Sequence, residues 1–286
     1  SGAAYADLDY DGDLELVACG DYYQAYFRYD GGDTFTKVDL PTSVGQTSLR
    51  YAAWGDIDDD GFVDAYFGVS GRDQIMMNKE GVLTPVSSTL LDASSEGSEF
   101  AIWSDFNNDQ RLDLTVLQQR DHIFATTTNG YEINLSFDWY PTSPSANSSW
   151  VDFDNDGDLD FYSWASSSTW VYENTGDGNL VRRLSSPLND VIGNFNSVSW
   201  VDYNYDGFVD AMPLATDNGI YQNTPNGNGW IRVRLRGQQS NSKGVGAKIF
   251  LKANGQWQRR DIHTGHSAQV QQGFDVIFGL GASTKV

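Results

Sequence analysis

The sequence predicts an all-β protein: a β-propeller of at least five blades followed by a small C-terminal β-domain. One aspartate-rich loop pattern occurs five times, starting at residues 7, 56, 105, 152 and 202, with steps of 49, 49, 47 and 50 residues. An aromatic residue stands two positions before each loop, and short apolar runs follow it. Regular repeats of roughly 40–50 residues are typical of propeller blades, because one blade cannot bury both of its faces alone.

Each repeat opens with a loop that offers oxygen atoms in a fixed order. Oxygen-bearing side chains at positions 1, 3 and 5, with glycine at position 6, resemble the first half of an EF-hand loop, which binds Ca²⁺. Glycine permits the positive φ of so tight a turn, position 7 offers its carbonyl oxygen, and an acid at position 9 completes the ligand set. The residues at positions 1, 3, 5 and 9 are Asp7, Asp9, Asp11 and Glu15; Asp56, Asp58, Asp60 and Asp64; Asp105, Asn107, Asp109 and Asp113; Asp152, Asp154, Asp156 and Asp160; and Asp202, Asn204, Asp206 and Asp210.

Strands, not helices, are expected around these loops. An EF-hand needs a helix on each side and Glu at position 12, and the sequence has neither. Apolar runs instead follow the loops at 16–18, 65–67, 114–116, 161–163 and 211–213. A second series lies at 25–27, 74–77, 122–124, 169–172 and 219–221, before turns rich in Gly, Asn and Asp. Each repeat therefore predicts three or four short strands, the usual content of one blade.

The aromatic residues before the loops predict the packing between blades. Each aromatic residue stands two positions before the first aspartate of its loop, so the two residues lie on the same face of the strand. We expect this stripe to form the core between neighbouring blades rather than a platform for a ligand. The five residues are Tyr5, Trp54, Trp103, Trp150 and Trp200.

With these motifs, residues 1–226 resemble FG-GAP or VCBS repeats, the calcium-loop blades shared with integrin α-subunit propellers. The resemblance implies one Ca²⁺ in each loop, about five ions in all, with the ligands given above. It adds backbone oxygens at position 7, from Asp13, Phe62, Arg111, Asp158 and Phe208. Loop three departs from the pattern, with Gln110 in place of glycine and Asn107 in place of an acid, so we expect it to bind most weakly. The family commonly builds seven blades, whereas five are visible.

Residues 227–286 predict a separate β-domain. Apolar Ile231, Val233 and Leu235 alternate with Arg232, Arg234 and Arg236, which places three arginines on one strand face. The segments 241–249, 260–269 and 278–281 make this region similar to the ASPIC and UnbV domain, which follows such propellers in secreted proteins. The resemblance implies no settled activity. That family usually continues with one more strand, so we expect an open sheet edge here.

Charge divides the chain into the same two parts. Residues 1–226 carry 9 basic and 37 acidic groups, whereas residues 227–286 carry 9 basic and 2 acidic groups. The acidic part argues against nucleic acid as a partner, and the basic part predicts contact with an acidic propeller, in the same chain or in a neighbour. The second arrangement would give homo-oligomers or filaments in which Arg232, Arg234 and Arg236 face the next copy.

Catalysis and membrane insertion have little support in the sequence. Single Cys19 is expected to be a buried strand residue, and His122, His263 and His266 are expected on surface strands. No apolar run has the length of a membrane span. Asn134 and Asn147 lie in glycosylation acceptor patterns.

The function expected from these observations is that of a secreted or cell-surface calcium-binding scaffold, non-enzymatic, whose partner is an extracellular protein or glycan. Calcium loops of extracellular type bind at roughly 0.1–1 mM, which suits a place where calcium is plentiful. The alternative is a carbohydrate-active enzyme or lectin on the same propeller. A convergent set of Tyr, His, Arg and acidic residues at the central opening would favour the enzyme.

Overall fold

The structure, a computed structural model, is all-β, as predicted. It describes residues 2–19, 25–40, 48–86, 98, 100–117, 122–127, 130–136, 145–165, 168–176, 178–190, 197–214, 219–238, 241–263 and 273–286. Within these ranges no helix is both long enough and apolar enough to cross a membrane. His266 lies outside the described residues.

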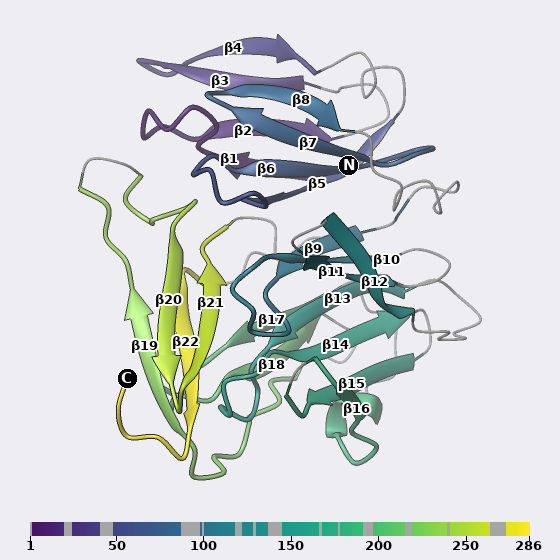
Figure 1. The fold of residues 1–286 in the computed structure, drawn as a ribbon, viewed down its shortest axis with the longest axis vertical. Coiled ribbons are helices and arrows are strands. Elements are labelled where there is room, and N and C mark those ends of the chain that lie inside the picture. The colour runs from purple at the N-terminus through teal and green to yellow at the C-terminus, as the bar shows by residue number, and fades with distance from the viewer. Residues whose placement is uncertain are drawn as a thin grey trace.

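The first four repeats each form one four-stranded antiparallel sheet, in which strands adjacent in sequence pair with one another (Figure 1). Blades one and two consist of β1 (Gly2–Ala6), β2 (Glu15–Cys19), β3 (Ala25–Gly31) and β4 (Thr34–Asp39), and of β5 (Leu49–Gly55), β6 (Asp64–Val69), β7 (Gln74–Lys79) and β8 (Val82–Val86). Blades three and four consist of β9 (Phe100–Ser104), β10 (Asp113–Leu117), β11 (His122–Thr127) and β12 (Gly130–Ser136), and of β13 (Ser145–Val151), β14 (Asp160–Ala165), β15 (Ser168–Asn174) and β16 (Leu180–Arg182). These sheets confirm the strands predicted after each loop.

The fifth repeat is described as a shorter blade. β17 (Ser197–Val201) pairs with β18 (Asp210–Leu214), and Tyr221 exchanges two backbone hydrogen bonds with Ala211 of β18, at 3.0 and 2.8 Å. A single 3₁₀ turn, η2 (Pro187–Asp190), precedes this blade. The predicted apolar run at 219–221 is therefore a bridge to the blade rather than a full strand.

The C-terminal residues form two antiparallel strand pairs. β19 (Gly229–Arg234) pairs with β22 (Asp275–Gly281), and β20 (Lys248–Ala253) pairs with β21 (Gln256–Asp261). Their shared core contains Leu251, Phe278 and Leu280, with Ile231 and Val233 packed against it. The predicted alternation of apolar and basic residues is thus confirmed within β19, where Ile231 and Val233 face the core. In Figure 1 the four strands lie beside the blades and face the ends that carry the loops.

Successive blades pack through the aromatic stripe. Trp54, Trp103, Trp150 and Trp200 are each at most 8% exposed. The indole Nε1 atoms of the last three donate to the blade before their own, to Ala53 O at 3.3 Å, Thr115 Oγ1 at 2.9 Å and Ser149 Oγ at 2.6 Å. The prediction of an inter-blade core is confirmed for these tryptophans. Tyr5, in the first blade, is 46% exposed.

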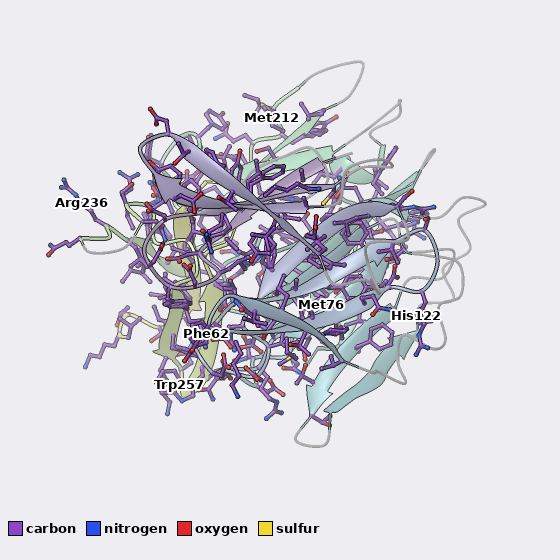
Figure 2. The ribbon with its side chains drawn as sticks, turned by 90° about the horizontal axis from the view of Figure 1, so that it is seen from above. Phe62, Met76, His122, Met212, Arg236 and Trp257 are labelled. Carbon is purple, nitrogen blue, oxygen red and sulfur yellow. The ribbon has the colours of Figure 1, made fainter. Side chains whose placement is uncertain are left out.

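Burial follows the position of a strand within its blade. All of β6 (Asp64–Val69) is buried, because blades cover it on both faces, and its sequence is accordingly a continuous apolar run after Asp64. β4 (Thr34–Asp39), at the outer edge of its sheet, is almost wholly exposed and carries polar residues. Figure 2 shows Met76 of β7 within the blades, whereas Trp257 and Arg236 lie at the margin of the C-terminal domain. The first strand of each blade is referred to as its inner strand. Each loop follows the inner strand, so every loop lies at one end of its blade.

Candidate calcium sites

Each predicted loop joins the first two strands of its blade. Position 1 follows the inner strand directly, and position 9 is the first residue of the second strand. The position 9 residues are at most 1% exposed, and they are Glu15, Asp64, Asp113, Asp160 and Asp210. Such deep burial of an acid is unusual unless it has an ionic or hydrogen-bonding partner.

The same hydrogen bonds shape all five loops. The amide of position 6 donates to the carboxylate of position 1 at 2.8–3.2 Å, and the amide of position 7 donates to the carboxylate of position 5 at 2.9 Å. The amide of position 5 donates to the side-chain oxygen of position 3 at 3.0–3.4 Å. In loops one, two and four these bonds engage one carboxylate oxygen at each of positions 1, 3 and 5, whereas in loops three and five both oxygens of position 1 and the single amide oxygen of position 3 accept backbone amides.

This hydrogen-bond pattern requires two residues with positive φ in every loop. Position 4 has φ between 58° and 63° in all five loops, although it is Tyr, Asp or Asn. Position 6 has φ from 90° to 105° where it is glycine, and Gln110 in loop three takes φ of 73°. Gln110 therefore adopts the turn that glycine provides elsewhere, at the steric cost of a side chain with positive φ.

In three loops the structure gathers the carboxylates of positions 1, 3 and 9. Their ligand oxygens lie within 4.8 Å of one another in the triads Asp7, Asp9 and Glu15; Asp56, Asp58 and Asp64; and Asp152, Asp154 and Asp160. Loops three and five have Asn107 and Asn204 at position 3. They therefore have fewer acids, but the position 5 amide still donates to the position 3 side-chain oxygen. The predicted ligand sets are thus brought together most fully in loops one, two and four.

Buried oxygens without a partner test whether these sites fit a cation. Five such carboxylate oxygens occur in the described loops, all at position 1 or 9: Asp7 Oδ1, Glu15 Oε1, Asp56 Oδ1, Asp113 Oδ2 and Asp152 Oδ1. A buried acceptor without a donor is costly, and a set of them facing one centre suits a hard cation such as Ca²⁺. The donor set therefore fits calcium.

The electrostatics of the loops point the same way. Burial, together with neighbouring carboxylates, raises the pKa of Glu15 and Asp152 to about 7 and that of Asp113 to about 8. Backbone hydrogen bonds oppose these shifts but do not cancel them. A bound divalent cation would replace the repulsion by attraction and keep the carboxylates ionised.

Loop three, which is expected to bind most weakly, has one ligand engaged by a cation. The Arg111 guanidinium pairs with Asp109 Oδ2, so that the second oxygen of the position 5 ligand is already engaged. Loop five has a milder version of this contact, in which Asn204 donates to Asp206 Oδ2 at 2.8 Å. The arginine contact and the neutral Asn107 lower the charge available to a metal, and the positive φ of Gln110 adds a steric cost.

Three asparagines that the sequence reasoning missed tie each loop to the loop before it. Asn78, Asn174 and Asn223 each donate their backbone amide to the position 9 carboxylate of their own blade, at 2.8–2.9 Å. Their side-chain Nδ2 atoms donate at 2.6–2.8 Å to the position 2 carbonyl of the preceding loop. An asparagine 21 or 22 residues after position 1 was the signal in the sequence. Blade three has Thr126 at this place, whose amide donates to Asp113 at 2.8 Å.

The basic C-terminal domain lies on the loops of its own chain. Lys248 Nζ contacts Asp56 Oδ2 at 2.6 Å and Asp59 Oδ1 at 2.9 Å, and the Arg232 guanidinium pairs with Asp202. The amide of Gly279 donates to Asp152 Oδ2 at 3.1 Å. A Cβ on this glycine would lie 2.3 Å from the same oxygen, so the close approach needs glycine. The predicted contact between the basic and acidic parts therefore forms within one chain.

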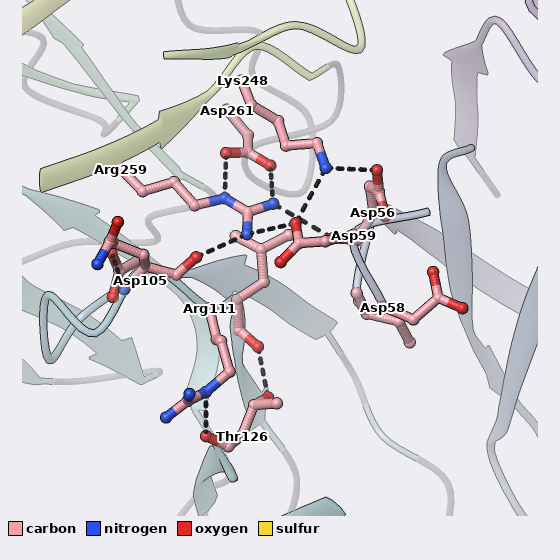
Figure 3. Close-up of polar contacts among 12 residues, drawn as sticks. Asp56, Asp58, Asp59, Asp105, Arg111, Thr126, Lys248, Arg259 and Asp261 are labelled. Carbon is pink, nitrogen blue, oxygen red and sulfur yellow. Dashed lines mark hydrogen bonds and ion pairs between the residues drawn. The ribbon is translucent and has the colours of Figure 1, made fainter. Parts of the chain in front are cut away.

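Arg259 is the most deeply buried of these cations, at 1% exposure. Its Nε and Nη2 atoms donate to both carboxylate oxygens of Asp261 at 2.8 Å (Figure 3). The Nη1 atom donates to Asp59 Oδ1 at 3.0 Å and to the carbonyl of Gln110 at 2.9 Å, and Nη2 donates to the carbonyl of Asp56 at 3.2 Å. One side chain therefore joins loops two and three to the C-terminal domain.

Two of the three arginines expected to face a neighbouring copy have partners within the chain. Arg232 faces Asp202 of its own chain, and Arg234 pairs with Asp275 inside the C-terminal domain, so both have a carboxylate partner within the chain. Arg236 is exposed at the margin of the domain (Figure 2). The reason is geometric, since the arginine face of β19 (Gly229–Arg234) turns towards loop five.

A cavity of about 800 Å³ lies between the C-terminal domain and blades three to five. Its propeller side consists of the last residues of the inner strands β9, β13 and β17, together with position 1 of the following loops. Its other side comes from β19, β21 and β22. Tyr205, His263, Arg260 and Asp261 are on the cavity wall.

The remaining candidate residues are placed as follows. Cys19 is buried, as predicted, and burial raises the pKa of its thiol to about 12. Burial lowers the pKa of His263 to about 4, so it is neutral at pH 7. Asn147 is 3% exposed, which leaves no room for a glycan at this acceptor pattern.

Comparison with known proteins agrees with the fold and the loops. The family model described as FG-GAP-like repeat matches residues 7–67 and 152–212, and the model described as ASPIC and UnbV matches residues 237–286. The repeated sheets and loops define a protein of the β-propeller class. The chain carries FG-GAP-like repeats followed by an ASPIC and UnbV domain, which confirms the resemblance seen in the sequence.

Two of the solved structures that match the chain differ in how closely they superpose. A lectin of Agrocybe aegerita that specifically recognises non-reducing terminal N-acetylglucosamine is 16% identical, with a TM-score of 0.53 over 87% of this chain and 73% of that chain. A Photorhabdus luminescens Tc holotoxin pore is also 16% identical, with a TM-score of 0.40 over 90% of this chain and 14% of that chain. No curated protein sequence matches the chain. At these identities the first likeness shows the fold alone.

Proposed function

We propose that the chain is a calcium-stabilised binding scaffold that acts outside the cell or at its surface and is not an enzyme. The observation that carries this proposal is the repeated set of buried, partnerless carboxylate oxygens in the loops. Calcium bound there would stabilise the folded state rather than react, because the loops also hold the blades together through the asparagine contacts. A rigid propeller with a fixed C-terminal domain suits recognition of an extracellular protein or glycan.

The expected calcium affinity supports the proposed location outside the cell or at its surface. Several ligands stay partly exposed, as Asp58 does at position 3 of loop two, so we expect weak sites that fill only where calcium is at millimolar levels. Outside the cell this condition is met. Measuring the calcium dissociation constants by calorimetry tests the assignment, since affinities tighter than about 10⁻⁷ M would suit a cytosolic site instead.

Partner binding can be tested directly. The full chain, labelled at an exposed lysine, is applied to arrays of extracellular proteins and of glycans in about 2 mM Ca²⁺, a level above the expected dissociation constants. We expect reproducible binding to a small set of partners that disappears with chelator and returns with added calcium. Binding that is identical with and without calcium at every partner contradicts a role for the loops in recognition.

A carbohydrate-active enzyme is the second candidate function. The observation in its favour is the cavity wall, which includes Tyr205, His263, Arg260 and Asp261. Incubation with a panel of polysaccharides, followed by mass spectrometry of the products, separates the two functions. Release of fragments by the wild type and its loss in Tyr205→Phe would establish the enzyme.

Head-to-tail association of copies stays a prediction. Because Arg232 and Arg234 have their carboxylate partners within the chain, the contact would have to involve other surfaces. Sedimentation in calcium at low and high salt measures it, and a monomer under all conditions contradicts it.

A further inference from the structure

The cavity between the C-terminal domain and blades three to five borders three of the calcium loops and two of the arginines that join the domain to the loops, but the calcium sites and these contacts do not account for its interior. Its volume of about 800 Å³ lies within the range of small-ligand sites, roughly 300–1,000 Å³. It lies over the inner strands, where a ligand would touch both the propeller and the C-terminal domain. A ligand here would therefore be recognised only when the two parts are in contact.

The cavity wall is rich in cations. Six basic side chains border it, and in the described part of the chain three of them form ion pairs with carboxylates, namely Arg232, Arg234 and Arg259. The other three form no ion pair there, and these are Arg236, Lys243 and Arg260. Lys243 lies over the ring of Phe274 at 5.9 Å, and Arg260 donates to two backbone carbonyls.

The acids of the wall offset these three cations only in part. Asp105 and Asp152 interact electrostatically with Arg260, and in the described residues none of the acids pairs with Arg236 or Lys243. Asp261 and Asp275 are taken by Arg259 and Arg234. The other three acids on the wall are the position 1 residues of loops three, four and five, which the calcium sites would claim: Asp105, Asp152 and Asp202. With metal in those loops the cavity carries a clear excess of positive charge, which selects an anion.

The wall also holds a polar group that has no partner. Ser104 is 8% exposed, borders the cavity, and its Oγ has no hydrogen-bond partner. A buried hydroxyl without a partner is costly, and a ligand hydroxyl or carbonyl in the cavity would satisfy it. Ser149 and Ser242 add further hydroxyls to the wall, and exposed Tyr205 contributes an aromatic ring.

From these observations we propose that the cavity binds an acidic saccharide of one or two sugar rings, whose carboxylate or sulfate group contacts Arg260, Lys243 and Arg236 while a ring substituent meets Ser104. A polyhydroxylated ligand matches a wall that includes three serines, a tyrosine and several arginines, and the acid group matches the cations without an ion pair. The assignment deepens the proposed function, because it names a glycan class and a site for the binding scaffold.

Titration calorimetry of the full chain in calcium tests the site, with a disaccharide that carries one uronate and one sulfate as the probe. A neutral disaccharide of equal size and inorganic sulfate serve as comparison ligands. We expect one saturable site for the acidic disaccharide, with a dissociation constant of 1 mM or tighter as an order of magnitude. Arg236→Gln/Lys243→Gln should weaken binding at least about tenfold, because hydrogen bonds to charged groups are lost. Both residues are exposed or near the rim, so the variant should fold.

A matched control keeps the result specific. Lys285→Gln removes one exposed charge that does not border the cavity, and it should leave the affinity unchanged. Equal binding of the neutral disaccharide, binding of sulfate alone, unaltered affinity in the double variant, or no binding up to an order of 10 mM would each overturn the proposal. If the acidic disaccharide fails to bind while the arrays still give a calcium-dependent partner, the cavity assignment fails and the proposed function stands.

Discussion

Arg259 offers the sharpest test of how the C-terminal domain is held on the calcium loops. We consider Arg259→Met, which keeps most of the aliphatic volume and removes the guanidinium. The side chain is 1% exposed and makes five hydrogen bonds, two of them to Asp261, whose side chain is 7% exposed. Removal leaves the Asp261 carboxylate buried without its counter-charge.

The expected magnitude follows from which of these contacts are buried. Breaking a buried ion pair by deleting one partner costs about 3–5 kcal/mol. The contact with Asp59 adds little, because that side chain is 48% exposed and its charge is screened by solvent. The two carbonyls of Asp56 and Gln110 lose a donor as well. We therefore expect a loss of about 3–5 kcal/mol in the free energy of unfolding.

Urea unfolding in excess calcium, followed by tryptophan fluorescence, measures the loss. Arg259→Met/Asp261→Leu should recover much of the stability, since it removes the orphaned charge as well. Arg236→Met is the matched control, because that arginine is exposed and forms no ion pair in the described residues, and its effect should stay within about 0.5 kcal/mol. A loss below about 1 kcal/mol in Arg259→Met, or a double variant less stable than the single one, would refute the reasoning.

Three further predictions concern the loops. Gln110→Gly should raise the calcium affinity of loop three, because glycine takes the positive φ of 73° without strain; calorimetry that finds every affinity unchanged contradicts this. Asn174→Ala should destabilise the chain by about 2–3 kcal/mol, because the buried carbonyls of Phe106 and Leu159 lose their donor; the exposed Asn179→Ala is the control, and equal melting temperatures would rule out the inter-blade contact. In excess chelator the melting temperature should rise as pH falls from 8 towards 5. Burial and neighbouring carboxylates raise the pKa of Glu15 and Asp152 to about 7 in the folded state, so the stabilisation by bound protons is lost as pH rises through that value. Calcium should reverse the trend, because protons then compete with the metal; a chelated protein that is most stable at pH 8 contradicts the assignment.

The loops were predictable from sequence because their chemistry is local. Positions 1, 3, 5 and 9 are fixed by a short chain segment, and a period of about 49 residues makes chance recurrence improbable. The strand after each loop followed from the same reasoning, since an acid at position 9 opens an apolar run. Position 4 was missed because, although Asn and Asp favour the left-handed region, two of the five loops have Tyr there, so the position has no common residue type.

The contacts between distant segments could not be predicted in this way. Asn174 donates to Phe106 of the preceding loop, 68 residues away, and only the packing of neighbouring blades brings the two together. Complementary charge predicted that the basic domain would meet the acidic propeller but left open which copy it would meet. The choice depends on the path of the chain after residue 226, which places β19 over loop five. The cavity arises from the same packing and has no counterpart in any single motif.

Melting of the full chain with and without calcium tests the central claim most directly, namely that the five loops hold calcium and that the metal stabilises the fold. At a calcium concentration tenfold above the dissociation constant each site adds about 1.4 kcal/mol, so five sites add about 7 kcal/mol. We predict that calorimetric melting in calcium occurs more than about 10 °C above melting in chelator, with magnesium giving a smaller shift. Calcium and chelator curves that coincide would contradict the account, because buried carboxylates that need a cation cannot be indifferent to its removal.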